Sequence, residues 1–239
     1  MKSKSFTFRL HLLISAFLLF SYTCLGQEVK NDSEYHPNVV GLAKNGIFQG
    51  HDVLKNHLSS FQNKHGNSHD FKTLHKIAVH DKMHYEIGSF QTENGDKFAQ
   101  VIIWVGNSDA EQKILEAVYA VSPNKDTEVL DKITKARNKW VKLCNKHDAE
   151  KLVSELYTDD AIYYNRGRIL RGHGPLSTEY SYMNSSSYSL QLNPKHVEVV
   201  NENIVFEVGR CSGSYPLPYL LIWKKQADGS WKIYMDSNY

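Results

Sequence analysis

The sequence predicts an α+β fold made of two copies of one structural unit. Residues 35–54 and 157–176 align without a gap and are identical at five positions. The identical pairs are Tyr35/Tyr157, Ile47/Ile169, Gly50/Gly172, His51/His173 and Leu54/Leu176. In the later copy, segments with helical spacing precede a run of strand-like segments. A repeat of this length predicts two similar units. The order of elements predicts helices packed on one face of a mostly antiparallel sheet.

Shorter matches continue the repeat toward the C-terminus. Glu86-Ile-Gly88 matches Glu207-Val-Gly209, and Ile103-Trp104 matches Ile222-Trp223. Lys113-Ile114 then matches Lys232-Ile233. The offset between the copies falls from 122 to 121 to 119, as loop deletions predict.

The first 26 residues have the features of a signal peptide. Lys2, Lys4 and Arg9 form a basic start, residues 10–20 are apolar, and small-residue spacing predicts cleavage after Gly26. The apolar run is shorter than the ~20 residues that span a bilayer. We therefore expect an exported protein, periplasmic or secreted, without a membrane span. Two alternatives are a lipoprotein cut at Cys24 and a buried first helix.

Charge and motifs exclude several classes of partner. Removal of residues 1–26 takes away three positive charges, which leaves 25 basic against 26 acidic residues. This near-neutral chain has no basic block that predicts binding to nucleic acid or to an anionic membrane. No Gly-rich phosphate loop or Gly-x-Ser-x-Gly motif is present, so we expect no cofactor.

The later copy predicts a complete set of elements in order. Residues 127–146 have apolar side chains at helical spacing. Asp148 is placed to cap a second helix that ends near Leu156. A short strand follows at residues 161–164, and Pro175 suits the first turn of a third helix. The last four strands are expected at residues 191–199, 204–211, 217–225 and 231–237.

The earlier copy predicts the same elements from the short strand onward. We expect a strand at 39–40, a helix at 52–63, and strands at 76–79, 83–90, 98–106 and 112–120. Few residues separate the cleavage site from Tyr35, so two leading helices have no room. We therefore predict a truncated repeat at 27–121, a linker at 122–126 and a complete domain at 127–239. The sheet face that lacks its helices is expected to pack on the other repeat; a homodimer of the whole chain is a further possibility.

Residues 127–239 resemble the nuclear transport factor 2-like superfamily, and within it the SnoaL-like and ketosteroid-isomerase-like proteins. Three motifs in order carry the resemblance: Leu156-Tyr-Thr-Asp-Asp-Ala161, Gly172-His-x-x-Leu176 and Asp228-Gly-Ser-Trp-Lys-Ile-Tyr-Met-Asp236. Residues 35–120 match the same pattern from the first strand. The resemblance implies a cone in which a curved sheet wraps a long helix around a pocket. Such pockets serve isomerases, cyclases, dehydratases and binding proteins alike, so fold does not give function.

Two departures from the family argue against steroid-isomerase chemistry. The resemblance places the catalytic base four residues after Ala161, where this chain has Asn165. An amide accepts no proton at neutral pH. The position of the tyrosine donor on the first helix falls at Trp140, which donates only through its indole N–H.

The ligand-binding candidates belong to the second repeat. Strand alternation places Tyr163 and Asn165 on one face, where the few polar groups of a ligand site are expected. The alternative is that Asn165 caps a turn. The first repeat has Gly41 and Ala43 at the matching positions. The expected pocket walls are Trp140, Tyr163, Asn165 and Tyr219.

Acidic side chains provide one weak catalytic candidate. Asp236 could act as a base if burial raised its pKa, although a solvated strand-end carboxylate is the alternative. Alternation places it beside Lys232 and Tyr234. Glu86 and Glu207 occur in both copies, which indicates a structural role such as accepting hydrogen bonds from a loop.

Histidines and cysteines predict no site. His51 and His173 precede a helix in both copies and are expected to bond its free amides. The pairs His65/His69 and His80/His84 have i,i+4 spacing, but the second falls in strand and turn, so we expect no metal site. Two cysteines remain after cleavage, at 144 and 211. Buried free thiols are the favoured interpretation and a disulfide is the alternative.

Three functions remain open. The leading hypothesis is an exported protein that binds a small, mostly apolar molecule in the second repeat. The second is a cofactor-independent isomerase, cyclase or dehydratase with Asp236 or a histidine as base. The third is a structural or protein-interaction module with a filled cone. A cavity below about 100 Å³ would favour the third, because ligand pockets usually measure several hundred.

Overall fold

The computed structural model describes residues 34–107, 110–122 and 128–238. Residues 35–239 form one compact unit. The expected signal peptide at 1–26 lies outside the described residues, as does the expected linker except for Ser122. No helix among the described residues has the length and apolar character of a membrane span.

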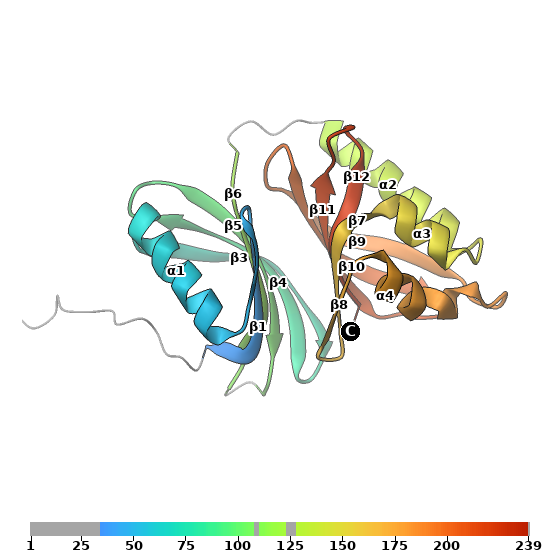
Figure 1. Cartoon of the computed structure of the whole chain (residues 1–239), viewed down its shortest axis with the longest axis horizontal. Coiled ribbons are helices and arrows are strands. Elements are labelled where there is room, and N and C mark those ends of the chain that lie inside the picture. The colour runs from blue at the N-terminus through green and yellow to red at the C-terminus, as the bar shows by residue number, and fades with distance from the viewer. Residues whose placement is uncertain (1–33, 108–109, 123–127, 239) are drawn as a thin grey trace, which may run out of the picture. The chain divides into compact units, whose positions relative to one another are not determined.

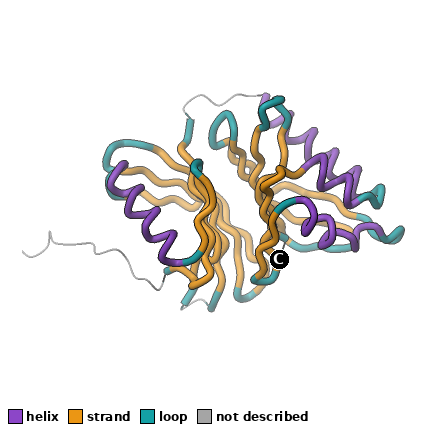
Figure 2. The backbone as a smooth tube through the Cα atoms, in the orientation of Figure 1, coloured by secondary structure: helices purple, strands orange, loops and turns teal. Residues whose placement is uncertain are grey.

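Each repeat of the described chain contains one six-stranded sheet. Figure 2 shows the strands of each repeat side by side, with helices on one face. Strand order is β2-β1-β6-β5-β4-β3 in the first sheet and β8-β7-β12-β11-β10-β9 in the second. The two orders are identical once six is added to each number. In both sheets one pair is parallel, β1 with β6 and β7 with β12, and the others are antiparallel. The α+β prediction is confirmed.

The elements of the first repeat are β1 (Tyr35–Ala43), β2 (Gly46–Gln49), α1 (His51–His65), β3 (Ser68–His80), β4 (Met83–Thr92), β5 (Lys97–Val105) and β6 (Gln112–Ala120). Those of the second repeat are α2 (Glu128–Cys144), α3 (Ala149–Leu156), β7 (Tyr157–Asn165), β8 (Arg168–Arg171), α4 (His173–Glu179), the 3₁₀ helix η1 (Tyr180–Asn184), β9 (Leu190–Val199), β10 (Ile204–Gly213), β11 (Pro218–Lys225) and β12 (Trp231–Ser237). β1 begins where the described residues begin, so the absence of two leading helices stays a prediction.

The repeated glycine has a local conformational cause. Gly50 precedes α1 with φ of 88°, and Gly172 precedes α4 with φ of 75°. Side chains other than glycine rarely adopt this left-handed region. The histidine that follows is the first residue of each helix. His173 does not bond the helix amides as expected: its Nε2 lies 3.1 Å from the carbonyl oxygen of Tyr157.

Helices cover one face of each sheet (Figure 1). In the second repeat α2, α3 and α4 share an apolar core with the sheet, which includes Trp140, Leu152 and Leu176. In the first repeat, α1 is the one described helix, and it packs on the same face of its sheet. It is 15 residues long, against seven for α4. Its last turns bring Phe61 to within 4.8 Å of the Phe98 ring centroid, so the longer helix covers part of the sheet that α2 covers in the other repeat.

The two sheets pack against each other through their other faces. One buried cluster joins side chains of both sheets, including Tyr85 and Ile103 of the first and Phe206 and Ile222 of the second. Within this layer the Tyr85 hydroxyl lies 2.9 Å from Ser237 Oγ. The repeats therefore pack together as predicted, but the predicted reason is wrong. The shared faces are those without helices, not the face that the missing helices would cover.

A bulge interrupts the last strand of each sheet. In β12 the register shifts so that Ile233 pairs with Trp223 and Met235 with Ile222, which leaves Tyr234 unpaired with β11. β6 has the same irregularity at Ile114. Because a bulge adds one residue, every later side chain lies on the face opposite to that given by simple alternation. This shift decides where Asp236 lies.

Candidate functional site

A buried polar network surrounds Asp236 in the second repeat. Tyr157 of β7 donates its hydroxyl hydrogen bond to Asp236 Oδ2 at 2.6 Å, and Tyr180 of η1 donates to the same oxygen. Trp140 of α2 donates from Nε1 to the Tyr157 hydroxyl at 3.0 Å. Asp236 is 3% exposed, and Tyr157 and Tyr180 are fully buried. Side chains from α2, β7, η1 and β12 thus form one buried network, in which two tyrosines donate to the carboxyl group.

The bulge at Tyr234 places Asp236 on the helix-covered face. Simple alternation predicted Asp236 beside Lys232 and Tyr234. Instead Tyr234 belongs to the core between the sheets, and the Lys232 ammonium bonds the carbonyl oxygen of Ser154. The alternative of a solvated strand-end carboxylate is also wrong, because Asp236 is buried.

Burial controls the protonation of this network. Desolvation raises the pKa of Asp236 to about 6, against the opposing effect of the two tyrosine hydrogen bonds. Desolvation also raises the pKa of Tyr157 and Tyr180, and the nearby Asp236 carboxylate raises it further. The tyrosines therefore stay protonated at neutral pH and act as donors. The Asp236 carboxyl group, in contrast, loses its proton near pH 6.

The cavity beside this network is small. It has a volume of about 10 Å³. Its lining residues are Trp140, Leu190, Leu192, Cys211, Tyr219, Leu221, Asp236 and Asn238. This volume is roughly that of a single water molecule and is far below the several hundred Å³ of usual ligand sites. Side chains of the buried core therefore fill most of the space around Asp236.

The four residues expected to form the pocket walls separate into two groups. Trp140 and Tyr219 line the cavity. Tyr163 does not line it: its hydroxyl donates to Asn238 Oδ1, and its ring packs against Tyr180. Asn165 lies further along β7, where its Nδ2 donates to Glu179 Oε1 at 3.1 Å. This amide joins β7 to α4 instead of facing the cavity.

A second buried network anchors α2 to the sheet through Glu207, which is fully buried. Arg137 of α2 donates to both its carboxylate oxygens, at 2.7 and 2.9 Å. Burial opposes the charge on Arg137, but the bonds to Glu207 outweigh it and raise the arginine pKa. Tyr219 and Trp223 donate at 2.8 and 3.0 Å. These partners come from a helix and a strand, not from the loop expected for Glu207.

The recurrent glycine beside this glutamate has a steric cause. A Cβ at Gly209 would lie 2.5 Å from the Tyr219 hydroxyl oxygen and 2.4 Å from the carbonyl oxygen of Asn193. Only glycine leaves room for the Tyr219 ring to cross the strand and reach Glu207. At the matching Gly88, a Cβ would lie 3.1 Å from the amide nitrogen of Gln100.

The first repeat preserves both networks in altered form. Trp104 donates to Glu86 as Trp223 does to Glu207, and the Thr73 hydroxyl takes the place of the arginine at 2.6 Å. Tyr35 donates to Glu116 at 3.0 Å, which corresponds to Tyr157 and Asp236. Register supports this equivalence, because Glu116 pairs with Gly41 as Asp236 pairs with Tyr163.

Sequence reasoning missed three members of these networks. Glu116 was hidden because the sequence match of Lys113 with Lys232 is one residue out of register: in the structure Lys113 pairs with Tyr35 as Ile233 pairs with Tyr157. Tyr157 was identified only as part of the repeat, although its identity with Tyr35 was the available signal. Tyr180 lies beyond the repeated segment and has no counterpart in the sequence pattern.

No group of metal ligands is formed by the residues that the structure describes. His65 ends α1 while His69 lies in β3, where its Nδ1 is 3.1 Å from the Gln91 carbonyl oxygen. Cys144 and Cys211 are buried free thiols. Burial raises the pKa of both to about 12, so neither is a nucleophile at neutral pH.

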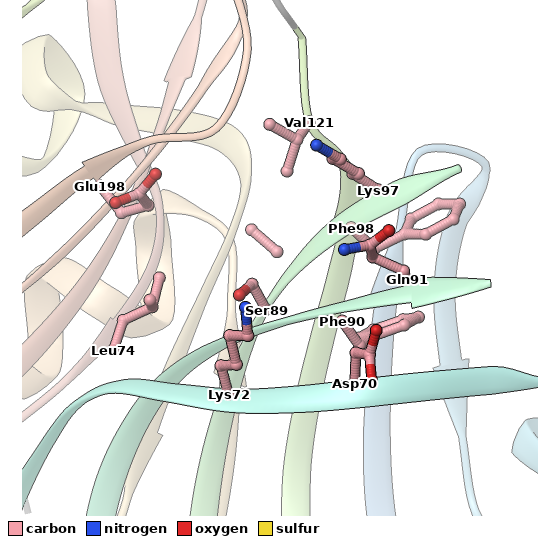
Figure 3. Close-up of a pocket in the computed structure, with 11 residues that line it drawn as sticks. Asp70, Lys72, Leu74, Ser89, Phe90, Gln91, Lys97, Phe98, Val121 and Glu198 are labelled. Atoms are coloured by element: carbon pink, nitrogen blue, oxygen red, sulfur yellow. The ribbon is translucent and has the colours of Figure 1, made fainter. Parts of the chain in front are cut away.

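A groove of about 260 Å³ lies at one edge of the contact between the sheets. Figure 3 shows side chains of β3, β4 and β5 on one side and Glu198 of β9 on the other. Small side chains create it. Tyr85 and Ile87 of β4 and Ile103 and Val101 of β5 fill the shared core, but the next positions on this face are Ser89 and Ala99.

Comparisons with known proteins give similarities of fold alone. No protein-family model and no curated protein matches the chain. An NTF-2 like protein of unknown function from Shewanella oneidensis MR-1 is 17% identical with a TM-score of 0.41, over 46% of this chain and 97% of that one. An NTF-2 like protein of unknown function from Silicibacter pomeroyi is 13% identical with a TM-score of 0.40, over 48% and 97%.

A ketosteroid isomerase-like protein from Erwinia carotovora atroseptica is 20% identical with a TM-score of 0.37, over 47% of this chain and 95% of that one. These similarities agree with the NTF2-like resemblance found in the sequence. They carry no argument about a substrate or a reaction.

Proposed function

We propose that this protein binds a small molecule in the groove between its two sheets, without a cofactor. The difference in volume supports this proposal: the groove measures about 260 Å³ and the cavity of the second repeat about 10 Å³. A site just below the usual range of several hundred Å³ suits a small ligand. The filled second repeat then serves as the scaffold that holds β9 opposite the first sheet.

Native mass spectrometry of the full chain tests this proposal. We expect a co-purified small molecule that Ser89→Trp removes, because the indole would fill the groove. Leu192→Trp is the matched control, because it fills the small cavity of the second repeat instead. Loss of the molecule in Leu192→Trp alone would return the site to the second repeat, with Trp140 and Tyr219 as its walls. An apo mass for the unaltered protein would contradict binding of this kind.

Acid–base catalysis in the second repeat is a second candidate. Asp236 lines the cavity and its pKa of about 6 suits proton transfer near neutral pH. A substrate larger than one water would require the cavity to widen. Proton exchange at the α-carbon of small ketones, followed by NMR, tests this candidate. A base at Asp236 predicts a rate that rises through about pH 6 and is lost in Asp236→Asn; unchanged exchange in the variant would exclude it.

We also propose export of the mature chain. The basic start and apolar run of residues 1–26 support it. Intact mass of the protein from its native host provides the test. A chain that begins after Gly26 is expected, and retention of Met1 to Gly26 would contradict export by this signal.

A further inference from the structure

We propose that the groove selects a small organic carboxylate with an apolar body. This inference deepens the proposed function and rests on it. It follows from three features of the groove wall: two lysines without ion partners, neutral hydrogen-bond donors beside them, and an apolar floor.

The lysines lie on one face of the first sheet. Lys72 of β3 pairs in register with Ser89 of β4, which pairs with Ala99 of β5. Gln91 pairs with Lys97 two residues further along. Side chains two residues apart on a strand share a face, so all five point toward the groove that they line. Figure 3 shows the labelled side chains among them on the same side, away from Glu198.

Sheet geometry allows both ammonium groups to reach one anion. Lys72 and Lys97 are two strands and two residues apart. Strand spacing and rise then separate their Cα atoms by about 12 Å. A lysine side chain is a flexible four-carbon stem that extends about 6 Å. Two such chains can converge on a single carboxylate above Ser89 and Gln91.

The charges of the groove favour an anion. Among the described residues, neither Lys72 nor Lys97 has a carboxylate partner within 4.0 Å. The groove also contains Asp70 and Glu198. Glu198 lies 3.6 Å from His196 Nε2 and takes part in further interactions. Asp70 has no partner in the described chain. The two lysines and two carboxylates give the whole lining no net charge, but the wall formed by the first sheet has two ammonium groups against the single carboxylate of Asp70.

The rest of the wall suits a hydrocarbon body. Ala99 is buried at the floor, and Leu74 and Val121 stand at its rim. Phe90 and Phe98 also border the groove, but their rings pack against Phe61 of α1 on the other face of the sheet. Leu74 is 40% exposed. An apolar ligand that covers this side chain removes apolar surface from water, which stabilises the complex. The carboxylate of such a ligand would attract the lysine ammonium groups, and its hydrocarbon part would bury apolar surface.

Binding of three matched probes to the full chain tests the inference. Octanoate, 1-octanol and octylammonium share one hydrocarbon chain and differ in the charge of the head group. Chemical shifts of groove amides report binding of each. We expect octanoate to bind most tightly and octylammonium least, and we expect added salt to weaken octanoate alone. Equal affinity for the three probes would overturn the charge preference.

Substitutions locate the effect. Lys72→Gln and Lys97→Gln should each weaken octanoate about two- to fivefold, as expected for one exposed ion pair, with no change for 1-octanol. Lys135→Gln, on the exposed side of α2, is the control and should change neither. Loss of octanoate affinity in Lys135→Gln as large as in the groove variants would contradict the assignment.

Ser89→Trp separates the two levels of the proposal. Suppose that Ser89→Trp abolishes binding of 1-octanol, but the unaltered protein binds octanoate no more tightly than 1-octanol. The groove then binds ligands, and the carboxylate inference fails. If all three probes bind the variant as they bind the unaltered protein, the groove itself is not the site and both proposals fail. Thermal unfolding of the variant checks that it is folded.

Discussion

At Asp236, burial and hydrogen bonding act on the same carboxyl group in opposite directions. Burial disfavours the charged form, and the two tyrosine donors favour it. Burial prevails, since the pKa rises from 3.8 to about 6. The unfolded chain releases this proton at lower pH than the folded protein does. Asp236 therefore stabilises the folded state when protonated and loses this contribution as the pH rises.

The first prediction concerns the pH dependence of stability. The contribution of Asp236 is fully present below its unfolded pKa of 3.8 and is lost as the pH rises through about 6. Relative to Asp236→Asn, the unaltered protein should lose on the order of 3 kcal/mol of unfolding free energy over this range. Urea unfolding of both proteins between about pH 4 and pH 7 measures the difference. A difference that does not change with pH would show that the carboxyl pKa is normal.

Sequence could predict part of this site. It identified Asp236 as a candidate base because the sequence shows an aspartate near the end of the last predicted strand. It placed the side chain on the wrong face because the bulge at Tyr234 leaves no mark in the alternation of apolar residues. Hydrogen bonds from Tyr157 and Tyr180 depend on tertiary packing across 79 and 56 residues of sequence, which local patterns do not encode.

At the scale of elements, the strands with clear boundaries were predicted best. β12 spans Trp231–Ser237 and β6 spans Gln112–Ala120, as predicted. Both carry apolar residues between turn signals. β2 and β8 were missed because each has only four residues. β3 begins at Ser68 instead of Lys76 because its first half lies exposed at the sheet edge, where no apolar alternation is required.

The contact between α2 and its sheet depends on the Arg137–Glu207 pair. Arg137→Leu would leave a fully buried carboxylate without its cation, which typically costs about 3–5 kcal/mol. The first repeat offers a matched control. Thr73→Val removes a neutral donor from the more exposed Glu86, and a loss of about 1 kcal/mol is expected.

Denaturant unfolding of a double-mutant cycle checks this second prediction. Addition of Glu207→Gln to Arg137→Leu should recover part of the lost stability, because the amide needs no counter-ion. A double variant less stable than Arg137→Leu would show that the ion pair is not the source of the loss.

At the scale of the whole molecule, the two repeats share one core. The buried cluster between the sheets contains Tyr85 and Val101 of the first repeat and Phe206 and Leu220 of the second. Separation of the sheets would expose all of these side chains at once. Apolar burial dominates the stability of folded proteins, so neither sheet should open while the other stays folded.

Native-state hydrogen exchange tests this third prediction. Amides of Ile87 in β4 and of Val208 in β10 should exchange with free energies that agree within about 1 kcal/mol. The amide of Leu58 in α1 should exchange with a lower free energy, because Leu54 is the one fully buried side chain of that helix. A first sheet that exchanges well before the second would indicate two independent folding units.

The back-to-back packing has a consequence for how the duplicated gene can change. The core that both repeats share is built from side chains on the sheet faces that carry no helices. Substitutions on the helix-covered face of one sheet therefore leave the shared core intact, and each repeat can change there independently of the other. A protein engineer could enlarge the space around Trp140 and Tyr219 without redesigning the half that contains Glu116.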